Sequence, residues 1–132
     1  MKSDLYSSLT EKINSGNFSS IFILVDENTE KYCLDIFLQK SKIKSYNKID
    51  ILSGESNKNI ESCISIWDQL NSFKADRKSL LINLGGGVLT DIGGFAASTY
   101  LRGISFINIP TTLLGMVDAA HGGKTGIDFK LL

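Results

Sequence analysis

The chain has 132 residues, and its 14 lysines and arginines balance its 14 aspartates and glutamates. This length suits one domain with a hydrophobic core, and the neutral balance gives no basic surface for nucleic acid or for membrane lipids. The N-terminus (MKSDLYSSLT) lacks the apolar core of a signal peptide, no apolar stretch reaches the length of a membrane span, and Cys33 and Cys63 form no CxxC motif. We therefore expect a cytoplasmic protein with free thiols and with no nucleic-acid or membrane partner.

The first half of the chain alternates between helical and extended patterns. Apolar residues that recur every three or four positions predict amphipathic helices, and short continuous apolar runs predict strands buried on both faces. The expected elements, in order, are a helix over 4–15 that ends at Gly16, a strand over 21–25 followed by Asp26, a helix capped by Asn28 with Tyr32, Cys33, Ile36 and Phe37 on its apolar face, and a strand over 46–52.

The second half continues the alternation. It predicts a helix opened by Asn57 or Asn59 with Ile60, Cys63, Ile64, Trp67 and Leu70 on one side, a strand over 79–84, a helix with Asp91 in its first turn and Arg102 at its end, a strand over 105–109 closed by Pro110, a helix from Thr111 or Thr112 through Ala120, and no finished element over 122–132. Strands and helices that alternate at this spacing form βαβ units. The fold class is therefore α/β, with a mostly parallel sheet and helices on both faces.

Residues 80–103 contain the most informative pattern. An apolar run ends at three successive glycines, Gly85 to Gly87, and a helical stretch begins there. Glycines let the backbone approach a ligand, and the free N–H groups and dipole of a helix start favour negative charge. Ligands of parallel sheets gather at the carboxyl ends of the strands. The sequence therefore predicts an anion site at this turn.

Two familiar phosphate-binding motifs do not fit. A GxGxxG fingerprint that began at Gly85 would need a glycine where Thr90 stands. A P-loop that ended at Gly123-Lys124-Thr125 would need a glycine at Asp118, and a helical pattern precedes it instead of a strand. Asp26 can still hold a ribose diol, because a carboxylate accepts hydrogen bonds from both hydroxyls.

Two adjoining blocks, GGGVLTDIGGFAASTYLRG and INIPTTLLGMVDAAHGGKTGID, carry a family resemblance. They resemble the N-terminal domain of the 3-dehydroquinate synthases, almost without a break from Leu84 to Asp128, and VDEN at 25–28 and SGESNK at 53–58 fit more loosely. The resemblance implies a Rossmann-like domain that binds NAD. It also implies conversion of 3-deoxy-D-arabino-heptulosonate 7-phosphate, a phosphorylated sugar acid, to 3-dehydroquinate and phosphate in the shikimate route to aromatic compounds.

The resemblance implies a role for individual residues. The implied NAD contacts are Asp26 at the adenosine ribose, Glu55 and Lys58, the pyrophosphate cradle of Gly86, Gly87 and Val88, Asp91 at the nicotinamide side, and Thr111, Thr112 and Leu114. The implied catalytic residues are Asp118 and Lys124, which face substrate and cofactor, and Arg102, which reaches the substrate phosphate across a dimer interface. Guanidinium and ammonium groups suit this work because they neutralise phosphate while keeping their protons.

The resemblance makes residues 1–132 the NAD-binding N-terminal domain of a larger enzyme, which is implied to be a homodimer. The family also uses a divalent metal, zinc or cobalt. Its glutamate and two histidine ligands are implied in a later helical domain that this chain does not contain. We therefore expect the chain alone to be inactive and to hold no metal.

Each implied contact also has a plain structural alternative. Asp91 can be a helix N-terminal acid, Arg102 a helix C-terminal cation, Thr111 and Thr112 helix caps, and Glu55 and Lys58 a solvated pair. The resemblance implies no role for His121, and we expect it to have no catalytic function. Three functional alternatives remain. They are another sugar-phosphate cyclase, a metal-dependent polyol dehydrogenase, against which VDAAHGGKTGID counts, and a nucleotide-binding module without chemistry.

Overall fold

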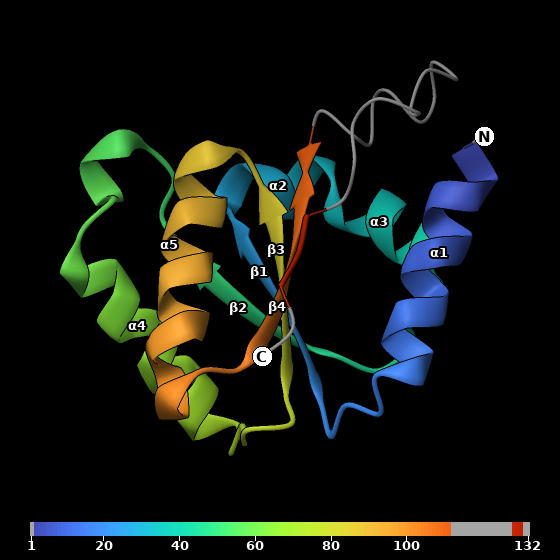
Figure 1. The fold of residues 1–132 in the computed structure, drawn as a ribbon. Coiled ribbons are helices and arrows are strands. Elements are labelled where there is room, and N and C mark those ends of the chain that lie inside the picture. Colours follow the sequence, from blue (N-terminus) through green and yellow to red (C-terminus); the bar gives the residue numbers. More distant parts are fainter. Residues whose placement is uncertain (1, 112–127, 131–132) are drawn as a thin grey trace.

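The computed structural model describes residues 2–111 and 128–130 of the chain (Figure 1). Within them, five strands form one sheet. The strands are β1 (Ile21–Asp26), β2 (Asn47–Ile51), β3 (Leu80–Gly85), β4 (Ser105–Pro110) and β5 (Asp128–Lys130). The helices are α1 (Lys2–Ser15), α2 (Glu27–Tyr32), α3 (Leu34–Ser41), α4 (Ile60–Ser72) and α5 (Gly87–Thr99), with short 3₁₀ turns η1 (Glu55–Asn57) and η2 (Tyr100–Arg102).

The sheet confirms the predicted α/β class. Its strands lie in the order β2-β1-β3-β4-β5, and β1 to β4 are parallel. The edge strand β5 is antiparallel to β4, with Phe129 opposite Ile107. The sequence pattern gave no element over 122–132, because a three-residue edge strand is too short to show a period.

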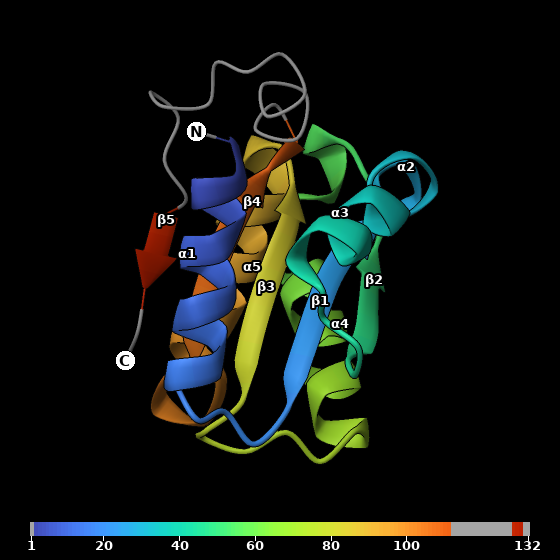
Figure 2. The ribbon, with the colours of Figure 1, turned by 90° about the vertical axis from the view of Figure 1, so that its right-hand side faces the viewer.

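Helices cover both faces of the sheet (Figures 1 and 2). α4 and α5 lie on one face, while α1 and α3 lie on the other. Successive residues of β1 enter the two cores alternately, with Phe22 and Leu24 facing α4 and α5, and Ile23 and Val25 facing α1 and α3. The continuous apolar runs follow from this double burial, as predicted.

The helix after β1 begins two residues earlier than expected. Asp26, and not Asn28, is its cap, because the helix follows the strand without a loop. Asp26 Oδ1 accepts hydrogen bonds from the N–H groups of Asn28 and Thr29, each at 2.9 Å, and Thr29 Oγ1 accepts from the Asp26 N–H at 2.9 Å. This reciprocal capping box fixes the side chain of Asp26 at the end of β1.

The predicted single helix is two helices, α2 and α3, which meet at Cys33. The backbone of Cys33 leaves helical geometry (φ −125°), which turns the apolar face of the segment. Phe37 is buried as predicted, but Tyr32 and Ile36 are 64% and 38% exposed. The expectation that Tyr32 and Ile36 face the core is therefore wrong.

Asn59 caps α4, and its side-chain oxygen accepts a hydrogen bond from the Ser62 N–H at 3.0 Å. The alternative cap, Asn57, lies in the preceding turn. The buried face of α4 consists of Cys63, Ile66 and Leu70, with Trp67 partly buried. The sequence pattern did not predict Ile66 on the buried face. It wrongly placed Ile60 and Ile64 there, which are 52% and 43% exposed.

The carboxyl ends of β1 and β3 lie side by side at the upper edge of the sheet in Figure 1, and we call the switch point between them the crevice. The connection from β1 to β2 passes over one face through α3, and the connection from β3 to β4 passes over the other through α5. The carboxyl ends of β1 and β3 are therefore neighbours from which the chain runs to opposite sides. Ligands of open parallel sheets bind at such a switch point. No helix of the described residues is long and apolar enough to cross a bilayer.

Candidate functional site

The glycine turn lies on one side of this crevice. β3 is buried along its whole length and ends at Gly85, and Gly86 then caps α5 without any side-chain hydrogen bond. The Thr90 N–H donates to the Gly86 carbonyl at 3.0 Å. The N–H groups of Gly87, Val88 and Leu89 come before this bond in the helix and have no intrahelical acceptor. They provide donors for an anion, as the sequence predicts.

The three glycines have different roles. A β-carbon on Gly85 would lie 2.9 Å from Leu89 Cδ1, so Gly85 allows close packing of α5 on its strand. Gly86 and Gly87 are exposed, and a β-carbon on either would meet no atom of the described residues within 4 Å. Neither has a left-handed φ; that of Gly86 is −84°. Backbone strain therefore does not require these two glycines, and the space beside their backbone is open to a ligand.

Asp26 lies across the crevice at the end of β1. Its side chain is only 9% exposed, and one carboxylate oxygen, Oδ1, accepts both capping hydrogen bonds. Among the described residues, none donates a hydrogen bond to Oδ2. This leaves one oxygen of a fixed carboxylate for a ligand hydroxyl. The negative charge of Asp26 also adds to burial, the larger cause, in raising the pKa of the Cys33 thiol.

Three predicted contacts form one charged cluster beside the glycine turn. Lys58 Nζ lies 3.0 Å from Asp91 Oδ2 and 4.0 Å from Glu55 Oε2. The hydrogen bond with Asp91 is the main reason that the pKa of Lys58 is raised, and the charges of Asp91 and Glu55 add to it. The sequence pattern predicts Asp91 in the first turn of α5, but Asp91 lies in the second turn. It therefore does not act as a helix N-terminal acid.

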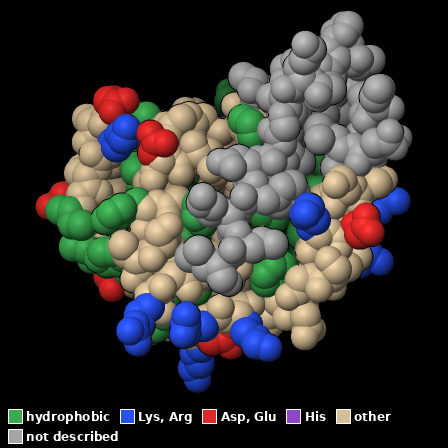
Figure 3. All heavy atoms as spheres, in the orientation of Figure 1, with side chains coloured by type: hydrophobic (Ala, Val, Ile, Leu, Met, Phe, Trp, Pro, Cys, Tyr) green, Lys and Arg blue, Asp and Glu red, His purple; other side chains and the backbone are tan. Residues whose placement is uncertain are grey.

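An apolar hollow of about 250 Å³ lies next to this cluster, between α4 and α5. Its floor includes Cys63 and Ile92, and its rim includes Lys58 and the exposed side chains of Ile60 and Phe95. Figure 3 shows hydrophobic side chains gathered over α4 and α5 on this face. Burial raises the pKa of the Cys63 thiol, so this sulfur stays protonated at neutral pH.

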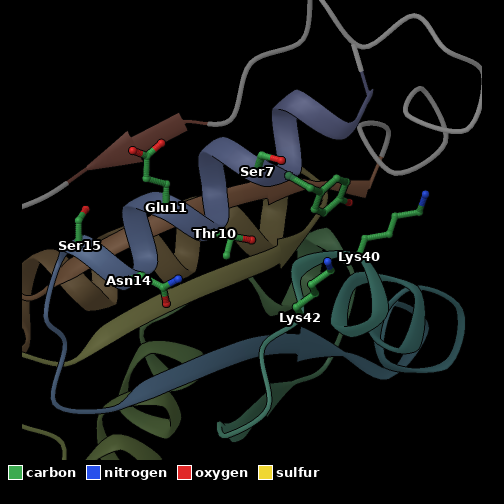
Figure 4. Close-up of a pocket in the computed structure, with 8 residues that line it drawn as sticks. Ser7, Thr10, Glu11, Asn14, Ser15, Lys40 and Lys42 are labelled. Atoms are coloured by element: carbon green, nitrogen blue, oxygen red, sulfur yellow. The ribbon is translucent and has the colours of Figure 1, made fainter.

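A larger hollow, of about 720 Å³, lies on the other face of the sheet, between α1 and α3 (Figure 4). Ser7, Thr10 and Asn14 of α1 form one wall, and Lys40 and Lys42 form the other. It contains none of the residues that the sequence predicts for the site.

The remaining predicted residues, apart from Arg102, fall into two groups. Thr111 directly follows β4, whose last residue, Pro110, is level with Gly85 in the sheet register, so Thr111 lies at the same edge as the glycine turn. The others lie outside the described residues, as does the predicted helix through Ala120. They are Thr112, Leu114, Asp118, His121 and Lys124.

Arg102 lies at the opposite end of α5 from the glycine turn. The helix ends at Thr99, earlier than predicted, and Arg102 follows in η2 with a left-handed backbone (φ 70°). Thirteen helical residues separate it from Gly86, which corresponds to about 20 Å. The structure therefore does not bring Arg102 to the crevice of its own chain.

Two polar residues near the crevice were missed by sequence reasoning. Ser53, at the end of β2, donates hydrogen bonds from its N–H (2.9 Å) and its hydroxyl (2.6 Å) to the carboxylate of Glu27. These bonds, led by that of the hydroxyl, lower the pKa of Glu27. The only sequence signal for Glu27 and Ser53 was that they lie within the blocks VDEN and SGESNK.

The strand order, the crevice at its switch point and the open glycine turn define the class of the domain as doubly wound, Rossmann-like α/β. Residues 48–132 match the 3-dehydroquinate synthase N-terminal family. The chain therefore belongs to the 3-dehydroquinate synthase family, as its sequence blocks predict.

Comparison with known proteins agrees with this assignment. The 3-dehydroquinate synthase of Parabacteroides distasonis is 47% identical over 130 residues, which are 96% of this chain and 36% of that protein. The chain thus spans about a third of the length of the curated relatives it matches.

Solved structures of sugar cyclases share the fold. A 2-deoxy-scyllo-inosose synthase in complex with carbaglucose-6-phosphate, NAD⁺ and Co²⁺ has a TM-score of 0.72 at 20% identity, over 81% of this chain and 30% of that chain. A 2-epi-5-epi-valiolone synthase from Streptomyces hygroscopicus, with NAD⁺ and Zn²⁺ bound, has a TM-score of 0.60 at 31% identity, over 77% of this chain and 29% of that chain.

Proposed function

We propose that this chain is the NAD-binding N-terminal domain of a 3-dehydroquinate synthase, which converts 3-deoxy-D-arabino-heptulosonate 7-phosphate to 3-dehydroquinate and phosphate. The observation that carries the proposal is the open space over Gly86 and Gly87 at the switch point of the sheet. The identity to named synthases supports the choice of reaction. The two free thiols, Cys33 and Cys63, suit a cytoplasmic location.

In this proposal the N–H groups at the start of α5 bind the pyrophosphate of NAD, and the open glycines admit it. Asp26 accepts a hydrogen bond from the adenosine ribose with its remaining oxygen. Lys58, fixed by Asp91, places a cation beside the anionic cofactor. Bound NAD would accept a hydride from the substrate alcohol and return it later in the turnover.

The other sequence-predicted residues complete the proposed site. Thr111, Thr112 and Leu114 are proposed as further NAD contacts, and Asp118 and Lys124 as residues that face both substrate and cofactor. Arg102 is proposed to serve the substrate phosphate of a partner subunit in a homodimer. Its position, remote from the glycine turn of its own chain, supports this assignment.

The metal of the family does not fit the described part of this chain. Within residues 2–111 and 128–130, no three histidine, cysteine, aspartate or glutamate side chains come close enough to hold a metal ion. We therefore assign no metal step to these residues. We propose that a zinc or cobalt ion binds in a separate helical domain, from ligands that this chain does not supply.

The test is turnover by the full-length protein. We expect phosphate release from the heptulosonate phosphate that needs both NAD and a divalent metal, and none from residues 1–132 alone, whose NAD affinity should also be weak. Turnover of a different sugar phosphate, with no activity on the heptulosonate phosphate, would show a cyclase of the same fold with another substrate. Metal-dependent turnover by residues 1–132 would overturn the division of roles.

A further inference from the structure

Ser53 has a hydrogen-bond partner at each of its polar atoms. Its N–H and hydroxyl donate to the two carboxylate oxygens of Glu27, and its carbonyl accepts a hydrogen bond from Asn57 Nδ2 at 2.7 Å. Asn28 Nδ2 adds a long contact, 3.4 Å, to the hydroxyl. A charged carboxylate that accepts two hydrogen bonds from one residue fixes both the position and the orientation of that residue. We call this contact the Glu27–Ser53 clamp.

The clamp joins the two sides of the crevice through the loop that follows β2. Glu27 is the first residue of α2 and directly follows Asp26. Ser53 begins the loop 53–58, which turns at Gly54 (φ 106°) and carries Lys58 at its other end. Lys58 is bonded to Asp91 of α5. The loop 53–58 is therefore fastened to α2 at one end and to α5 at the other.

We propose that Glu27 is a positioning residue for the cofactor. Through Ser53 it sets the place of the loop 53–58, and thereby of Glu55 and Lys58, relative to Asp26. The inference rests on the proposed NAD site, because it assumes that the loop faces the cofactor. Glu27 itself lies on the surface, so its effect on the folding of the domain is small.

The test compares four variants of the full-length protein. Glu27→Ala removes the clamp, Ser53→Ala removes one of its two hydrogen bonds, and Glu27→Gln retains an acceptor of the same shape. Glu30→Ala is the matched control, because Glu30 belongs to the same helix and pairs with Lys48 of β2, away from the loop. Amide hydrogen exchange of residues 53–58 and the Kd for NAD are measured on each variant.

We expect Glu27→Ala to speed exchange in the loop and to raise the Kd at least about fivefold, with Glu27→Gln and Ser53→Ala, which each lose one of the two hydrogen bonds, between Glu27→Ala and the parent. The control should change neither quantity, and the thermal midpoint should stay constant in all four. Unchanged exchange in Glu27→Ala would show that no clamp exists. Faster exchange with an unchanged Kd would show that the loop does not serve the cofactor. If the parent does not bind NAD, the proposed function fails, and with it the positioning role.

Discussion

The ammonium group of Lys58 lies 3.0 Å from Asp91 Oδ2, which joins the loop after β2 to the second turn of α5. Both side chains are exposed, at 43% and 62% of their area, and exposed ion pairs contribute little to folding. The pair does, however, hold a cation within reach of the glycine turn. We therefore expect the Lys58–Asp91 pair to contribute to ligand binding.

Lys58→Met should weaken NAD binding in the full-length protein at least about fivefold, while the thermal midpoint stays within about 2 °C of the parent. Lys48→Met is the control, because Lys48 forms a similar exposed ion pair, with Glu30. Titration calorimetry and thermal melts measure the two quantities. An equal loss of NAD affinity in both variants would show that Lys58 has no specific role.

Gly86→Ala or Gly87→Ala should raise the Kd for NAD at least tenfold, about 1.4 kcal/mol. The added methyl group enters the open space where the pyrophosphate is proposed to lie. The fold should tolerate it, because no atom of residues 2–111 and 128–130 lies within 4 Å of either β-carbon and neither φ is left-handed. Calorimetric titration with NAD on the purified variants provides the measurement. A variant that melts early but binds NAD normally while folded would contradict the cradle.

Gly93→Ala provides the contrast. Gly93 is buried in α5, and its β-carbon would overlap Asn83 Oδ1 and lie 2.8 Å from Leu24 Cδ2. Overpacking of this kind costs about 1–3 kcal/mol, so the thermal midpoint should fall by several degrees. NAD affinity, measured well below that midpoint, should change much less than in the Gly86 and Gly87 variants. A normal midpoint for Gly93→Ala would show that α5 moves readily on the sheet.

The sequence predicts the strands and the glycine turn well because both depend on local pattern. Strands buried on both faces, such as β1 and β3, appear as continuous apolar runs. Helix faces are less certain. A break at one residue, Cys33, changes which side of the segment meets the core, and no proline or glycine marks it. Likewise, the apolar residues of α4 form a wide face, with Ile64 and Ile66 at its two edges, so the pattern alone could not choose Ile66 over Ile64.

The candidate site is predictable where it depends on strand ends, and not where it depends on contacts distant in sequence. Asp26 and the glycine turn follow from parallel topology. The bonds between Glu27 and Ser53, and between Lys58 and Asp91, join residues 26 and 33 positions apart. Only the folded chain brings them together. The same holds for Arg102, which topology places at the far end of α5.

Asp76 should make the stability of the domain pH dependent. It accepts hydrogen bonds from the Ser19 hydroxyl at 2.5 Å and from the Lys78 N–H at 2.9 Å, and the Ser19 bond is the main reason that the pKa of Asp76 is lowered. A lowered carboxyl pKa stabilises the fold above the unfolded pKa, near 4, and this contribution is lost as the pH falls through the folded pKa. Asp76→Asn should therefore melt below the parent at pH 7, by about 2–4 °C.

This difference between the parent and Asp76→Asn should shrink as the pH falls below the unfolded pKa, near 4, and through the lowered pKa of Asp76 in the fold, where the parent carboxyl becomes protonated. Thermal melts of both proteins from pH 7 to pH 2.5 measure it. Asp35→Asn, on the exposed side of α3, changes the net charge equally and shows whether charge alone moves the midpoint. A difference that does not shrink at all as the pH falls below about 4 would mean that Asp76 acts through geometry and not through its charge.

Arg102 should act on the site of a partner subunit. It lies about 20 Å, the length of α5, from the glycine turn of its own chain. In the full-length protein, Arg102→Ala should lower phosphate release at least about a hundredfold, because a cation at the substrate phosphate is lost, and should leave the Kd for NAD unchanged.

Gly87→Ala should instead raise the Kd for NAD and leave Arg102 in place. If each site combines the glycine turn of one subunit with Arg102 of the other, a mixed dimer of the two variants contains one intact site, and its activity is assayed at an NAD concentration well below the Kd of Gly87→Ala. Co-refolding the variants should then restore about a quarter of the parent activity, since half of the dimers are mixed and each has one working site of two. Arg77→Ala, which removes another exposed arginine, is the control and should remain active alone. No recovery from the mixture, with dimers confirmed by sedimentation, would show that Arg102 does not serve a partner's site.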